Sequence, residues 1–285
     1  MFGAKLSSFC YFKFAKLYNT QMRCNAFRLA KTSYVGYFVM EFLLAGHSHS
    51  FACGVKASGD IRVEPIENTL LPILGLMGGW KGSRTTEYWD ALKENAKGRH
   101  VVLFWAGNQH NLGFMFKEEE TFDFYLKGHK QTQTKNTAFV PKAVVQEHFS
   151  SSFSRVKQIL SDLKACDCLS ITVVETPPPK GDNVFLLEFI KQSDHFLKLA
   201  EKAGINLEKL DVSSPLFRLK LWKVCQDLLK DICDEMNIRF VAVPEKMKAE
   251  DGTLDKKYWA NDITHANSEY GKAIVQYVYD RVLEE

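Results

Sequence analysis

A regular alternation between short strand-like runs and longer amphipathic stretches is the feature that most constrains the fold. The runs are rich in β-branched and aromatic residues, and most of them end in a Gly, Pro or polar cluster, as buried strands do. They cover residues 37–45, 101–106, 169–174 and 238–243, with a weaker run at 60–66. This rhythm predicts an α/β protein in which a central parallel sheet is covered by helices on both faces.

The stretches between these runs carry apolar residues at intervals of three and four positions, the period of a helix with one buried face. Residues 116–139 break this rhythm with alternating aromatic residues followed by a polar tract, so we expect an insertion at the ligand-binding edge of the sheet. The predicted helices cover residues 84–97, 141–165, 183–204, 214–237 and 267–283.

Length and charge limit the class of protein. A chain of 285 residues suits one α/β domain, here residues 36–285, preceded by a basic extension at 1–35. Six Lys and Arg residues precede the first acid, Glu41, so a net charge of +3 for the whole chain leaves −3 for the remainder. Nucleic-acid binding requires clustered cations that neutralise phosphates, so this mildly acidic body indicates no nucleic-acid partner.

The basic extension has the composition of an organelle presequence, although a segment packed on the domain or a start codon assigned too early would look the same. Seven cysteines without a CxxC pair suit reduced thiols. The expected location is therefore cytoplasmic, with an organelle as the alternative. The apolar run at 36–46 is interrupted by Glu41 and is too short to span a bilayer, so no integral membrane segment is expected.

In an open parallel sheet, ligands bind beyond the carboxyl ends of the strands. Polar residues gather after four of the predicted strands, in the segments GHSHS (46–50), GNQHN (107–111), ETPPPKGDN (175–183) and NDITHAN (261–267). These exits are where a functional site is expected.

One reading of these segments is a nucleophile with its base. A serine hydroxyl such as that of Ser48 is a weak nucleophile until an imidazole accepts its proton. His265 can supply this base, since Asp262, three residues earlier, can bind one ring nitrogen and leave the other free. The side chain of Asn108 and nearby backbone amides can then stabilise an oxyanion.

The four blocks together resemble the SGNH (GDSL-type) hydrolases. Gly46-His47-Ser48, a glycine cluster about thirty residues later, Ala106-Gly107-Asn108-Gln109 and Asp262-Ile263-Thr264-His265 occur in that family's order. The resemblance covers the chain from about residue 37 to its end. The segments THANSEYGKAI and ETPPP look similar to a bacterial branch of the superfamily.

Membership would imply a three-layer α/β/α sandwich of the flavodoxin-like type and a serine esterase that uses neither metal nor other cofactor. By this resemblance Ser48 is the nucleophile, His265 the base, Asp262 its orienting acid and Asn108 the oxyanion side chain. Gly78 is the expected glycine donor to the oxyanion, with Gly75 and Gly79 as the alternatives. The implied partner is a small-molecule or glycan ester, for example one carrying an O-acetyl or other short acyl group.

Two positions depart from the family pattern. His47 replaces the usual Asp between Gly and Ser, and Gln109 replaces the usual Asp after the Asn of the third block. Neither replaced residue is a core catalytic member, so the chemistry can survive. Together with His49 and His110, these two side chains are expected to line the substrate pocket.

Two other functions fit the same segments. His47, His49 and His110 could hold zinc or iron for metal-dependent hydrolysis, although no metalloenzyme spacing such as HExxH is present. An SGNH-like protein that binds an ester, a glycan or a protein without turnover is the other alternative. It predicts Ser48 and His265 out of alignment, whereas a hydrolase predicts that they lie within hydrogen-bond reach.

Overall fold

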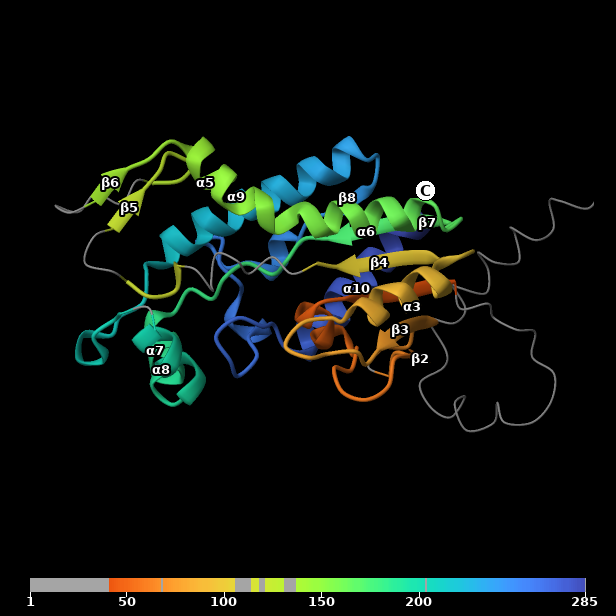
Figure 1. The fold of residues 1–285 in the computed structure, drawn as a ribbon, viewed down its shortest axis with the longest axis horizontal. Coiled ribbons are helices and arrows are strands. Elements are labelled where there is room, and N and C mark those ends of the chain that lie inside the picture. Colours follow the sequence, from red (N-terminus) through yellow and green to blue (C-terminus); the bar gives the residue numbers. More distant parts are fainter. Residues whose placement is uncertain are drawn as a thin grey trace, which may run out of the picture. The chain divides into compact units, whose positions relative to one another are not determined.

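A six-stranded sheet forms the centre of the protein (Figure 1). The computed structural model describes residues 41–67, 69–105, 114–117, 121–130, 137–202 and 204–284. The strand order is β2-β3-β1-β4-β7-β8. β2 pairs antiparallel with β3, and every other pairing in this sheet is parallel. The strands are β1 (Phe42–Gly46), β2 (Arg62–Pro65), β3 (Ile73–Met77), β4 (His100–Phe104), β7 (Ser170–Val174) and β8 (Arg239–Val241).

Helices cover both faces of this sheet, which confirms the predicted α/β fold with three layers. Leu43 and Ala45 of β1 belong to the core beneath the helices of one face, whereas Phe42 and Leu44 belong to the core beneath α10 (Ser268–Leu283). This division follows from the alternation of side chains along a strand. The helices of the first face are α3 (Thr86–Ala96), α5 (Lys142–Ser150), α6 (Ser154–Lys164) and α9 (Pro215–Glu235).

The sheet contains one strand, β3, that the sequence analysis did not predict, and the predicted run at 60–66 forms the antiparallel edge strand β2. The sequence pattern does not predict β3, because Pro72 precedes the strand and glycines lie within and after it, and proline and glycine usually mark loops. Gly75 lies inside the strand, where an added Cβ would come within 2.4 Å of the side chain of Ile66.

Two predicted helices are each divided in the structure. The stretch 141–165 forms α5, the 3-10 turn η2 (Ser151–Phe153) and α6, and the stretch 183–204 forms α7 (Asn183–Lys191) and α8 (Asp194–Lys202). At the first break, the hydroxyls of three serines donate to carbonyls three residues earlier, a local bond that competes with regular helix. These three are Ser150, Ser152 and Ser154.

The predicted insertion at 116–139 contains a small second sheet. β5 (Thr121–Asp123) and β6 (Thr137–Phe139) pair in parallel with each other. The helices α7 and α8 form a separate apolar cluster that includes Ile190 and reaches Ile263 of the fourth block. Short 3-10 turns complete the fold, namely η1 (Ser48–Cys53), η3 (Leu207–Lys209), η4 (Glu245–Met247) and η5 (Lys256–Tyr258).

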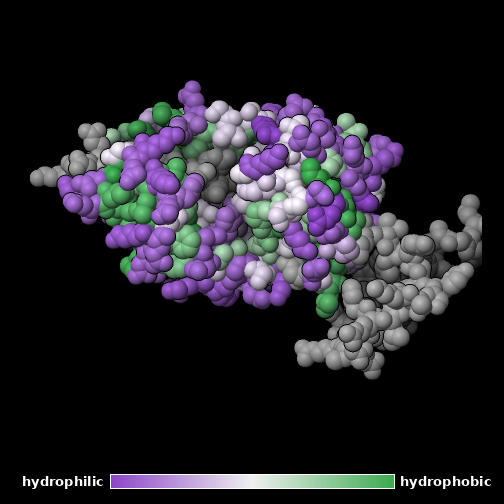
Figure 2. Space-filling view, turned by 60° about the horizontal axis from the view of Figure 1, so that its bottom comes forward, coloured by the Kyte–Doolittle hydropathy of each residue, from purple (hydrophilic) through white to green (hydrophobic). Residues whose placement is uncertain are grey.

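The face of the molecule seen in Figure 2 is mostly polar. Figure 2 shows hydrophilic side chains over much of one face, with apolar side chains in smaller groups between them. Within the described ranges, every helix is too short or too polar to cross a membrane.

Candidate active site

The turn that carries Ser48 leaves β1 at the carboxyl edge of the sheet. Gly46 has a φ of +141°, and a Cβ at this position would lie 2.0 Å from the carbonyl oxygen of Phe104. The next amide, that of His47, donates to the same oxygen at 2.9 Å. Glycine is therefore required at the strand exit, and Ser48 begins η1 directly beyond it, half-buried.

The close packing of α10 on η1 brings the fourth block to the first. Gly271 of α10 lies so near η1 that an added Cβ would be 1.8 Å from the carbonyl oxygen of Ala52. His265 lies three residues before α10, and its ring centroid is 5.3 Å from that of His49. The structure thus places the predicted base beside the turn that begins with the predicted nucleophile.

Asp262 and His265 form a hydrogen-bonded pair. Nδ1 of His265 lies 2.8 Å from Oδ2 of Asp262. The other oxygen, Oδ1, accepts hydrogen bonds from the amides of Thr264 at 2.8 Å and His265 at 2.6 Å. Because one carboxylate binds both the ring and the backbone of His265, the imidazole orientation is fixed.

The Asp262 carboxylate is charged at neutral pH. Burial by itself raises its pKa, but hydrogen bonds from the ring and backbone of His265 and the positive charge of Lys180 outweigh burial and hold the pKa well below its usual range. An ionised carboxylate can only accept, so Nδ1 of His265 carries a proton, and in the neutral tautomer Nε2 presents its lone pair.

Ser48 and His265 do not form a direct hydrogen bond in this structure. Nε2 of His265 is buried and has no hydrogen-bond partner in the part of the chain that is described. Catalytic hydrogen bonds are often long before substrate binds, so the missing bond is compatible with both a hydrolase and a binding protein. The neighbouring Ser50 is fully buried, and its hydroxyl donates to the carbonyl oxygen of His47 at 2.6 Å. Ser48 is therefore the more available of the two hydroxyls.

The amide groups near Ser48 bear on oxyanion binding. The amide of Ser48 makes no hydrogen bond to another described residue, as expected for the first N–H of a helical turn. The amide of Gly78 instead donates to the carbonyl oxygen of Lys56 at 2.9 Å. Gly79 follows with a φ of +68°, and its amide makes no hydrogen bond within the described ranges.

Arg84 links the first and second blocks, a role that the sequence reading missed. Its side chain is buried, and Nε donates to the carbonyl oxygen of Gly46 at 2.7 Å while Nη1 donates to that of Gly78. The guanidinium lies 4.1 Å from the ring centroid of Tyr88, whose hydroxyl accepts from the amide of Gly46 at 3.0 Å. These two side chains hold the ends of β1 and β3 at one edge.

His47 packs among aromatic rings. Its centroid lies 4.7 Å from that of Trp105, 5.3 Å from that of Trp89 and 6.5 Å from that of Trp80. Burial, with smaller contributions from the charges of Arg84 and Arg155, lowers the pKa of His47 to about 4. His47 is therefore neutral at physiological pH and forms part of the apolar support beneath the site.

Several predicted site residues lie outside the described residues, namely Asn108, Gln109 and His110, as does the basic extension at 1–35. Their predicted roles stay predictions. Within the described residues, no group of three or more His, Cys, Asp or Glu side chains is arranged to hold a metal ion.

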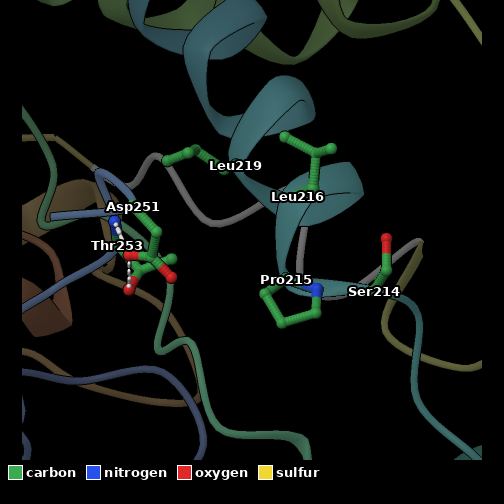
Figure 3. Close-up of a pocket in the computed structure, with 6 residues that line it drawn as sticks. All are labelled: Ser214, Pro215, Leu216, Leu219, Asp251 and Thr253. Atoms are coloured by element: carbon green, nitrogen blue, oxygen red, sulfur yellow. Dashed lines mark hydrogen bonds between the residues drawn. The ribbon is translucent and has the colours of Figure 1, made fainter. Parts of the chain in front are cut away.

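A cavity of about 470 Å³ lies between the start of α9 and the segment around Thr253 (Figure 3). Its lining contains none of the predicted site residues; it comprises Ser214, Pro215, Leu216, Leu219, Asp251 and Thr253. The cavity is nevertheless close to the segment 175–183 that follows β7, since a Cβ on Gly181 would lie 2.7 Å from the hydroxyl oxygen of Thr253.

Lys180 is the second functional candidate that the sequence reading missed. It ends the ETPPPK segment after β7, its side chain is almost fully buried, and Nζ lies 3.5 Å from Oδ1 of Asp262. A cation directly after a proline run at a strand exit was the available signal, but sequence does not distinguish a buried lysine from an exposed one.

No protein-family model and no curated protein matches the chain. Among solved structures it is similar to a protein from Bacteroides fragilis assigned as an acylhydrolase, at 13% identity, with 90% of this chain and 95% of that chain covered and a TM-score of 0.44. It is also similar to Est24, a carbohydrate acetylesterase from Sinorhizobium meliloti, at 13% identity, 86% and 99% coverage and a TM-score of 0.43.

Proposed function

We propose that this protein is a serine hydrolase that cleaves carboxylic esters through an acyl-enzyme on Ser48. The observation that carries the proposal is the Asp262–His265 pair, bonded at 2.8 Å, with its unpartnered Nε2 beside the turn that begins with Ser48. A carboxylate, an oriented imidazole and an available serine hydroxyl are the parts of a nucleophilic triad.

In the first half-reaction, Ser48 Oγ bonds to the ester carbonyl carbon while its proton passes to Nε2 of His265. The carbonyl π electrons move to oxygen and form a tetrahedral oxyanion. When this intermediate collapses, the ester C–O bond breaks and His265 returns the proton to the departing alcohol. Asp262 stays ionised throughout and holds the imidazolium in place.

In the second half-reaction, water attacks the acyl-enzyme and gives its proton to His265. Collapse then releases the carboxylic acid and restores the hydroxyl of Ser48. The proposed oxyanion donors are the amide of Ser48, the side chain of Asn108 and a glycine amide. Since the amide of Gly78 is occupied by Lys56, Gly79 is the more available donor of the glycine pair.

The proposed substrates are short acyl esters, including O-acetyl groups on sugars. Phe51 and Trp80 are half-buried near the first block with ring centroids 5.2 Å apart, an apolar surface suited to a small acyl or sugar ring. A series of nitrophenyl esters of increasing acyl length tests this choice, since a short-acyl site loses kcat/KM as the chain lengthens.

The test of the mechanism is labelling of chelator-treated protein by a fluorophosphonate, together with turnover of nitrophenyl acetate. We expect both to vanish in Ser48→Ala and turnover to collapse in His265→Ala. Ser50→Ala is the matched control, because it removes a neighbouring hydroxyl that faces the backbone, and it should keep the label. Labelling that survives in Ser48→Ala contradicts the proposal.

The alternatives give different outcomes in the same experiment. Activity that is absent after chelation and returns with zinc or iron indicates the histidine metal site. Absence of labelling and of turnover under all these conditions indicates a binding protein, an alternative with which the missing bond between Ser48 and His265 is also compatible.

A further inference from the structure

Lys180 carries a buried ammonium group that meets three oxygen atoms of one segment. Its side chain is 1% exposed. Nζ donates to the carbonyl oxygen of Ala260 at 2.7 Å and to the carbonyl oxygen of Asp262, and it lies 3.5 Å from Oδ1 of Asp262. An ammonium group has three N–H donors, so these acceptors match its full capacity. These contacts offset the free-energy cost of removing the ammonium group from water.

The segment held by Lys180 is the one that orients the proposed base. Of the three oxygens, two belong to Asp262, one from its backbone and one from its carboxylate. The same carboxylate bonds the ring and the amide of His265. A shift of the Asp262 backbone would therefore move the imidazole with it.

Lys180 is itself held in place. Its carbonyl oxygen accepts from Nη2 of Arg218 at 2.9 Å, and its backbone pairs with Leu254 in a parallel bridge. Nζ lies 5.3 Å from the ring centroid of Phe185 and 6.0 Å from that of Trp259. The ammonium is thus fixed between α9, α7 and the 259–262 segment, as a positioning group must be.

We propose that Lys180 is a positioning residue of this active site, holding the backbone and carboxylate of Asp262 where they orient His265. The proposal rests on the hydrolase function proposed above and adds a further side chain to that site. Lys180 acts through Asp262 and does not bind the substrate.

The charge on Lys180 gives this role a signature in the pH profile. Burial lowers its pKa to about 8, while the negative charge of Asp262 opposes the fall. The ammonium is therefore present below pH 8 and is lost as the pH rises above it, so kcat should decline on the alkaline side. The other titratable or charged groups around this position are the His265 ring bonded to Asp262, Arg218 on the backbone of Lys180, Asp251 beside Gly181, and the Lys256–Asp182 pair next to Trp259.

The test compares Lys180→Met with Lys220→Met. Lys220 is an equally buried lysine, paired with Asp123 and the carbonyl of Phe124 and not bonded to the 260–262 segment. We expect Lys180→Met to lower kcat for nitrophenyl acetate by about 10- to 100-fold with KM changed less than about 3-fold, because orientation and not binding is lost. The alkaline decline near pH 8 should disappear. Lys220→Met should lower the Tm and leave the pH profile unchanged.

A second variant and a second measurement keep the proposal testable if Lys180→Met does not fold or the wild type shows no turnover. Lys180→Arg retains a charge at all working pH values, so its alkaline decline should move above pH 8. In NMR, the hydrogen-bonded Nδ1 proton of His265 should be seen in wild type and in Lys220→Met and be lost or shifted in Lys180→Met.

The outcomes separate the two proposals. Wild type that lacks Ser48-dependent turnover contradicts the hydrolase function, and the NMR comparison then decides the role of Lys180 alone. An unchanged kcat and pH profile in folded Lys180→Met, an alkaline decline that stays at pH 8 in Lys180→Arg, or an unaltered Nδ1 proton in Lys180→Met each overturns the Lys180 proposal.

Discussion

Replacement of Gly271 by alanine tests whether the contact between α10 and η1 sets the geometry of the site. The new Cβ would lie 1.8 Å from the carbonyl oxygen of Ala52 and 2.2 Å from its carbonyl carbon. Real Cβ atoms essentially never approach closer than 3.0 Å, so the two backbones must separate by about 1.2 Å. Neither neighbour is a flexible side chain that can rotate away.

Two effects oppose each other in this variant. Alanine in place of glycine inside a helix stabilises by about 1 kcal/mol. Overpacking of a close contact costs about 1 to 3 kcal/mol, and the upper end applies because backbone atoms must move. We therefore expect net destabilisation of about 2 kcal/mol, which lowers the Tm by roughly 4 to 8 °C for a domain of this size.

The effect on catalysis should exceed the effect on stability. His265 lies three residues before α10 and Ser48 begins η1, so separation of these elements moves the proposed base and the proposed nucleophile apart. A misplacement of about 1 Å can lower the rate by about 100-fold. The assays are thermal unfolding and nitrophenyl acetate turnover, with Lys272→Ala on the exposed face of α10 as control. A Gly271→Ala protein with unchanged Tm and kcat would refute the packing argument.

Three further predictions concern polar side chains of the candidate site. Arg84→Met removes charge-assisted hydrogen bonds to the carbonyls of Gly46 and Gly78, so we expect a loss of about 3 kcal/mol in urea unfolding, and a loss below about 0.5 kcal/mol would contradict it. Because the pKa of His47 falls from 6.5 to about 4, the unfolded chain binds a proton between these values that the folded protein does not, and stability must rise with pH across that window. When the pH falls from 7 to 4, the free energy of unfolding of wild type should therefore drop by roughly 3 kcal/mol more than that of His47→Phe. Asp262→Asn should keep the hydrogen bonds that this side chain accepts from backbone amides. It should nevertheless lower kcat by about 10²- to 10⁴-fold, because the amide favours the wrong tautomer of His265. A normal kcat would exclude Asp262 from the mechanism.

The sequence by itself determined the fold class and the pairing of Asp262 with His265. Strand and helix periods are local properties, and the i to i+3 spacing of the pair lies within one turn, so neither depends on distant parts of the chain. The same local reasoning placed Ser48 after the glycine that ends β1. It failed for β3, where glycines and a proline conceal a buried strand, whereas the predicted run at 60–66 is present as β2, antiparallel to β3 at the sheet edge.

Only the tertiary structure decided which polar groups are buried and what they meet. Arg84 and Lys180 look like ordinary surface cations in sequence. In the structure both side chains are buried and donate hydrogen bonds to backbone carbonyl oxygens of other segments of the chain. Gly271 looks like a poor helix residue until its distance to η1 is known. Burial and close approach depend on how elements far apart in sequence pack together, and no local pattern records that packing.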